Sequence, residues 1–121
     1  MLKTSPITIR SLVKAYLKKV SKYFFNKNQT EEHEFIKDSA YRLFDEYFYH
    51  IKDDDDIFKE NNYISIISIV CFWLVYKFCI DDDVIHIDEI CILSKASKTL
   101  IQKEEIKIYK SIDFKILKFL S

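Results

Sequence analysis

The chain contains no glycine and a single proline, Pro6, among its 121 residues. Glycine adopts positive φ angles at no steric cost, so tight turns, P-loops and Rossmann turns depend on it. Hairpin-rich β folds need the same turns. Apolar residues make up 49% of the chain and aromatic residues 16%, which is enough for a core. We therefore predict one all-α domain spanning residues 1–121.

Hydrophobic periodicity divides the chain into five predicted helices. They cover about residues 7–25, 31–51, 58–80, 86–94 and 97–120. Thr30 is a suitable N-cap for the second, with Glu31 and Glu32 in its first turn. Short polar loops between five helices indicate a helical bundle.

The third predicted helix is apolar on all sides. Tyr63 to Ile80 reads YISIISIVCFWLVYKFCI, in which Lys77 is the only ionised side chain. Its 18 residues approach the length of about 20 that spans a membrane. However, three aspartates follow it directly, and neither end has a basic cluster. We predict a buried central helix, no membrane association, and contact of the Lys77 ammonium with water, a carboxylate or a partner.

The fifth predicted helix carries a second charge in an apolar pattern. Glu105 lies four residues after Ile101, on a stripe that continues through Ile108, Ile112 and Ile116. A carboxylate there is costly unless it lies at an edge or is paired. A salt bridge between Lys77 and Glu105 within the domain is one explanation.

The charge balance argues against nucleic-acid binding. The chain has 19 basic and 19 acidic residues, and hence no net charge. The first helix is locally basic, at Lys14, Lys18, Lys19 and Lys22. We interpret these lysines as a solvated face and not as a phosphate-binding stripe.

No metal or cofactor motif is present in the sequence. Three cysteines and three histidines are scattered without zinc-binding spacing. Asp53 to Asp56 lack the alternating spacing and glycine turn of a calcium loop. With no nucleophile elbow or metal triad, we expect no enzyme activity and no cofactor. The odd cysteine count and the lack of a secretory signal favour an intracellular protein, cytoplasmic or nuclear.

In its helix order and motifs the chain resembles a cyclin box. The segments that carry the resemblance are IRSLVKAYLKKV (Ile9 to Val20), SAYRLFDEYF (Ser39 to Phe48), CFWLVYKF (Cys71 to Phe78), HIDEICILS (His86 to Ser94) and, in the fifth helix, Ser97, Lys98, Ile101, Glu105, Ile112, Asp113, Phe114, Lys115 and Ile116. The resemblance covers nearly the whole chain and implies a five-helix cyclin-box bundle around a buried third helix.

The resemblance implies a function without catalysis. Cyclins bind a Ser/Thr protein kinase of the cyclin-dependent type and place its catalytic Lys–Glu pair. The third-helix lysine and fifth-helix glutamate of the family contact the kinase, and these roles fall on Lys77 and Glu105. A rival register puts Lys110 at the glutamate position, which reverses the charge of that contact.

The resemblance also implies a docking patch for short hydrophobic motifs of substrates and inhibitors. The matching positions on the first helix are Ile9, Arg10, Leu12, Val13 and Tyr16. Packing in the core is the other explanation for Leu12 and Val13.

Two further functions remain open. A helical interaction protein, such as an apoptosis-regulator-like bundle, also hides an apolar central helix and binds an amphipathic helix in a groove. A cyclin-type fold that contacts DNA is the third, and the neutral charge counts against it.

Overall fold

The protein is an all-α bundle of five helices in the part of the chain that is described. The computed structural model describes residues 6–25, 31–51, 61–79 and 85–112. The helices are α1 (Pro6–Phe25), α2 (Glu31–Ile51), α3 (Asn61–Cys79), α4 (Ile87–Ser94) and α5 (Lys98–Ser111). The predicted Thr30 cap and the aspartates Asp53 to Asp56 lie outside the described residues.

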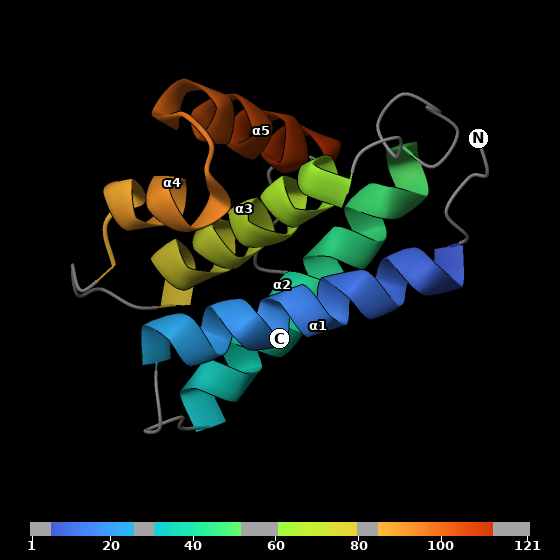
Figure 1. Ribbon diagram of the computed structural model, residues 1–121. Helices are drawn as coiled ribbons and strands as arrows, with labels where there is room; N and C mark the ends of the chain where they lie inside the picture. The colour runs from blue at the N-terminus through green and yellow to red at the C-terminus, as the bar shows by residue number, and fades with distance from the viewer. Residues whose placement is uncertain (1–5, 26–30, 52–60, 80–84, 113–121) are drawn as a thin grey trace.

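Helix α3 is the centre of the bundle, as its composition predicts. It contacts all four other helices. In Figure 1, α1 and α2 lie on one side of it and α4 and α5 on the other. Every residue from Ile66 to Tyr76 is buried. An apolar helix surrounded in this way needs no polar face.

The outer helices present one apolar stripe each to α3. On α1 the stripe repeats at four-, four- and three-residue steps, and on α2 similarly. The buried residues are Ile9, Val13, Leu17 and Val20 on α1, and Ile36, Ala40, Leu43, Phe44, Tyr47 and Phe48 on α2. Aromatic rings link the elements: Phe24 stacks on Phe72 with ring centroids 5.8 Å apart. The stripes thus join α1, α2 and α3 around one core.

The turn between α4 and α5 is built without glycine. Lys95 ends α4 in the left-handed region, at φ 57° and ψ 34°. The Ala96 amide donates to the Cys91 carbonyl over 3.2 Å, which closes the last turn of α4. The Ser97 hydroxyl then accepts a hydrogen bond from the Leu100 amide at 3.1 Å and caps α5.

Helix α5 is shorter than the sequence pattern predicts. We expected it to continue to Leu120, whereas it ends at Ser111. The apolar period runs on through Ile112, but serine and aspartate flank that residue, and both compete for backbone hydrogen bonds. The Ser111 hydroxyl donates to the Ile108 carbonyl at 2.6 Å. Residues 113–121 lie outside the description.

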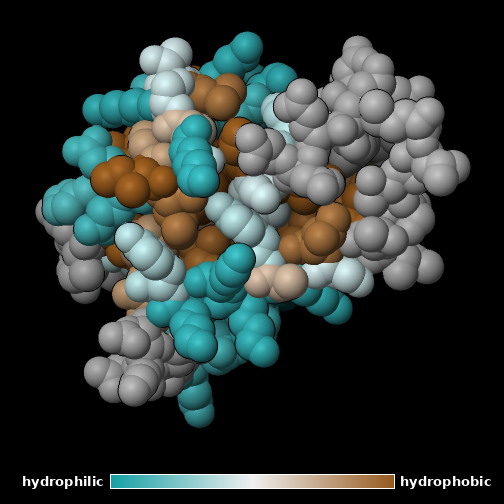
Figure 2. Space-filling model, in the orientation of Figure 1, coloured by the Kyte–Doolittle hydropathy of each residue, from teal (hydrophilic) through white to brown (hydrophobic). Residues whose placement is uncertain are grey.

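Hydrophobic side chains also reach the surface. Figure 2 shows them between hydrophilic residues on the face in view. The large exposed ones among the described residues are Leu12, Tyr23, Tyr49, Phe78, Ile92 and Ile106. Within the same residues, no helix combines the length and apolarity that a membrane crossing requires.

Candidate functional site: an ion pair beside an apolar pocket

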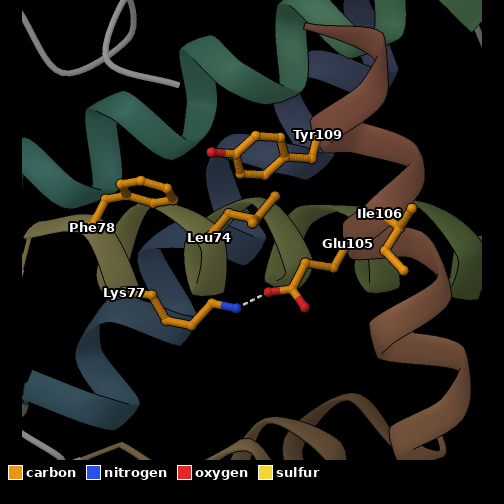
Figure 3. Close-up of a pocket in the computed structure, with 6 residues that line it drawn as sticks. All are labelled: Leu74, Lys77, Phe78, Glu105, Ile106 and Tyr109. Atoms are coloured by element: carbon orange, nitrogen blue, oxygen red, sulfur yellow. Dashed lines mark hydrogen bonds and ion pairs between the residues drawn. The ribbon is translucent and has the colours of Figure 1, made fainter. Parts of the chain in front are cut away.

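The end of α3 is where the central helix comes out of the core. Tyr76 is buried, whereas Lys77 and Phe78 are exposed. In Figure 3 the Lys77 side chain extends from this turn toward Glu105, which extends from α5, and Ile106 follows Glu105 on that helix. The two charges that stand out in the sequence therefore meet at one surface.

Lys77 and Glu105 form an ion pair between α3 and α5. The Lys77 ammonium donates to Oε1 of Glu105. The Lys77 side chain is 40% exposed and that of Glu105 is 16% exposed. The same ammonium lies 5.2 Å from the centroid of the Trp73 ring, one turn earlier on α3. A carboxylate and an aromatic face together hold the lysine in place.

The surroundings of Lys77 act on its charge in two opposing ways. Partial burial lowers the pKa of the ammonium from its ordinary value. The neighbouring carboxylate favours the charged form and holds it in the pair. A pair this open to water contributes less than about 1 kcal/mol to folding. The ion pair matters more as part of the protein surface between α3 and α5 than for the stability of the fold.

An apolar pocket lies next to the ion pair. We call it the α3–α5 pocket; it has a volume of about 420 Å³ and is lined by Leu74, Lys77, Phe78, Glu105, Ile106 and Tyr109 (Figure 3). Phe78 is 45% exposed and Ile106 is 55% exposed. One wall of the pocket is thus a donor–acceptor pair, and the rest is aromatic and aliphatic.

The structure brings the predicted residues Lys77 and Glu105 together. The salt bridge within the domain, which the sequence analysis gave as one explanation of the two charges, is present and is partly exposed. Lys110, the rival to Glu105, is exposed and is not among the residues that line the pocket.

The sequence analysis did not single out Glu104, the carboxylate that precedes Glu105 in the chain. Glu104 is only 2% exposed and lies in the interface between α3 and α5. The Tyr63 hydroxyl donates to its Oε2 over 2.9 Å, and the Lys107 ammonium lies 3.8 Å from its Oε1. Its position, three residues after Ile101 and four before Ile108, is compatible with facing inward, as is the position of Glu105. Glu104 thus links α5 to the first turn of α3, and the adjacent Glu105 pairs with Lys77 in the last turn of α3.

The residues of the predicted docking patch divide between core and surface. Ile9 and Val13 are buried in the core. Arg10 is partly exposed, and its Nε donates to Oδ1 of Asp45 at 2.8 Å.

Leu12 and Tyr16 lie instead at a second cavity. This α1–α3 pocket has a volume of about 340 Å³ and is lined by Leu12, Ala15, Tyr16, Lys19, Ile64 and Ser65. Leu12 is 40% exposed, which rules out full core packing for it. Burial raises the pKa of the Tyr16 phenol, in keeping with a half-buried ring. Of the five predicted positions, these two retain an open surface beside an apolar cavity.

Among the described residues, no group of three or more histidine, cysteine, aspartate or glutamate side chains is arranged to hold a metal ion. Comparisons with protein-family models, with curated proteins and with solved structures give no match to this chain.

Proposed function

We propose that the protein is a non-catalytic regulatory subunit that binds a Ser/Thr protein kinase of the cyclin-dependent type and activates it. The observation that carries the proposal is the Lys77–Glu105 pair at the rim of the α3–α5 pocket. The resemblance to the cyclin box assigns kinase contacts to these same two residues. The cyclin assignment itself rests on sequence motifs and helix order.

The chemistry of the pocket fits the face of a partner helix. Phe78 and Ile106 offer an apolar surface for a side chain to enter. The Lys77 ammonium can donate to backbone carbonyls of that helix, and the Glu105 carboxylate can accept from its amides or hydroxyls. A pair that is half-solvated in the free protein becomes desolvated when a partner covers it. Loss of one member of such a covered pair costs about 2–5 kcal/mol of binding free energy.

The proposed effect on the kinase is conformational. Phosphoryl transfer requires a lysine–glutamate ion pair within the kinase, and the glutamate sits on the mobile C-helix. A cyclin packs against that helix and holds it in the active position. The regulatory subunit then supplies no catalytic group of its own.

The proposal extends to a substrate contact at the α1–α3 pocket. Leu12 and Tyr16 combine exposed apolar surface with a cavity of about 340 Å³. A short hydrophobic motif of a substrate or inhibitor fits such a site. Arg10, two residues before Leu12 on α1, is held by its ion pair with Asp45 of α2. Ile9 and Val13 contribute by keeping α1 in place.

Charge reversal at the ion pair tests the kinase contact. We expect the tagged chain to co-purify with a Ser/Thr kinase, and Lys77→Glu or Glu105→Lys to reduce the yield at least about tenfold. Both side chains are partly exposed, so helical content by circular dichroism stays unchanged. Lys103→Glu, on the exposed side of α5, is the matched control and keeps full binding.

The double variant Lys77→Glu/Glu105→Lys separates an interface from a structural role. It restores an ion pair within the chain, but the positive and the negative side chain that face the partner have exchanged places. We expect kinase binding to stay lost. Recovery of binding in the double variant, or full binding in both single variants, would contradict the proposal.

A groove-type interaction protein is the second candidate, because most of the α3–α5 pocket is apolar. That function predicts binding of a pro-apoptotic helix peptide. It also predicts indifference to both charge reversals. Such a result, with no kinase bound, would replace the proposed function.

A further inference from the structure

A third cavity lies between α1 and α2 and shares no lining residue with the two pockets above. This α1–α2 pocket has a volume of about 250 Å³ and is lined by Lys14, Leu17, Lys18, Lys37, Asp38 and Tyr41. Lys14 and Lys18 are one turn apart on α1, and Lys37 comes from α2. The fold thus adds a third lysine to two that we interpreted from the sequence as a solvated face.

The pocket carries more positive than negative charge. Three lysines and one aspartate line it, and the Glu34 carboxylate beside Lys37 reduces the excess to one positive charge. The Lys37 ammonium is bound to Oε2 of Glu34 at 2.7 Å. Lys14 and Lys18 form no ion pair with any other described residue. Two ammonium groups at the cavity therefore have no carboxylate partner within that part of the chain.

Lys14 is held in position by an aromatic ring. Its ammonium lies 4.9 Å from the centroid of the Tyr41 ring, whose side chain is half-buried on α2. Tyr41 also lines the cavity. A lysine fixed in this way loses less side-chain entropy when it binds an anion.

We propose that the α1–α2 pocket binds the phosphorylated side chain of a protein partner. A phosphoryl group carries close to two negative charges near neutral pH and three acceptor oxygens. The ammonium groups of Lys14 and Lys18, which have no carboxylate partner among the described residues, can both donate to such a group, whereas a carboxylate offers one charge and two oxygens. A concave site between helices admits a side chain that protrudes from a partner. A flat lipid surface has no such protruding group. The proposal does not depend on kinase binding at the α3–α5 pocket.

The test uses a short alanine–glycine peptide with one phosphoserine and the full ¹⁵N-labelled chain. We expect chemical-shift changes at the amides around Lys14, Lys18 and Lys37. Lys14→Gln/Lys18→Gln should weaken the affinity by about tenfold or more, since one hydrogen bond to a charged group accounts for that much. Lys98→Gln/Lys103→Gln removes the same charge from α5 and should leave the affinity unchanged.

Four results would overturn the proposal. The first is a set of shifts that map elsewhere, and the second is unchanged affinity in Lys14→Gln/Lys18→Gln. The third is equal binding of peptides with serine or glutamate in place of phosphoserine, or of inorganic phosphate alone. The fourth is tighter binding to phosphatidylcholine–phosphatidylserine vesicles, which would assign these lysines to a membrane surface. The peptide comparisons need no variant and hold even if a substitution disturbs folding.

Discussion

At the scale of single residues, the three cysteines lie in different environments. Cys71 is fully buried on the central helix, whereas Cys79 and Cys91 are partly exposed. Burial raises the pKa of all three thiols, and most strongly that of Cys71. A thiolate at Cys71 has neither water nor a cation to stabilise it, so its ionisation is coupled to unfolding.

This coupling predicts a loss of stability in alkaline solution. A thiol whose pKa is raised by folding stabilises the native state fully below its ordinary pKa of 9.0, and that stability is lost as the pH rises further. The free energy of unfolding should fall by about 1.4 kcal/mol per pH unit above that value on account of Cys71.

Urea denaturation at about pH 8 and about pH 10 gives the change in the free energy of unfolding with pH. The difference in that change between the wild type and Cys71→Ala is the contribution of the Cys71 thiol. Cys91→Ala is the control, because its more exposed thiol should change the pH dependence less. Equal pH dependence in wild type and Cys71→Ala would contradict the prediction.

The sequence identifies residues when they interrupt a pattern, and less well when they lie within one. Lys77 is the only charge in its segment, so it was found directly. Glu105 was found because it falls on a stripe of isoleucines. Glu104 sits beside it in the chain and is the more buried of the two. Which of two adjacent carboxylates turns inward depends on how α5 is rotated against α3, and that is set by packing.

At the scale of the helices, the turn from α4 to α5 has the most unusual backbone. Lys95 is the only non-glycine residue with positive φ in the described part of the chain. A Cβ atom in this conformation is strained by about 1–2 kcal/mol. The chain places a lysine where helices that end in the left-handed conformation usually have glycine.

We therefore expect Lys95→Gly to stabilise the protein by about 0.5–1 kcal/mol, since relief of strain outweighs the greater freedom of glycine in the unfolded chain. Thermal unfolding followed by circular dichroism measures the change. Lys95→Ala is the matched control, because it removes the charge and keeps the Cβ atom. An equal gain in Lys95→Ala would assign the effect to the charge.

Helix boundaries followed from the sequence where local signals agree. Both ends of α2 and the C-terminal end of α1 match the prediction, because polar segments interrupt the apolar period there. The predicted end of α5 was wrong, because the apolar period continues past Ser111 whereas the helix ends there and Ile112 is its cap. The lining of the pockets was not predictable, since it depends on which helix faces cross in space.

At the scale of the whole molecule, one helix connects everything that is described. Because α3 contacts every other helix, the described helices share a single core around Phe72 and its neighbours. The sequence predicted this arrangement from the absence of a polar face on that segment. It did not predict that α3 would also contribute to both the α3–α5 and the α1–α3 pockets.

A shared core predicts unfolding in one step. Trp73 is the only tryptophan of the chain and lies at 8% exposure on α3. Its fluorescence reports on the centre, whereas far-ultraviolet circular dichroism reports on all helices. We expect the two signals to give the same midpoint in guanidinium chloride. Separate midpoints would indicate that part of the bundle unfolds independently.

The ion pair between Lys77 and Glu105 also bears on how fast the proposed partner would associate. Opposite charges in contact present a local dipole with almost no field at long range, and the chain as a whole carries no net charge. A protein approaching the α3–α5 pocket is then not steered from a distance. Its association rate constant should be about 10⁵–10⁶ M⁻¹s⁻¹ and nearly independent of ionic strength. Selectivity at this face then depends on how slowly a well-fitting partner leaves.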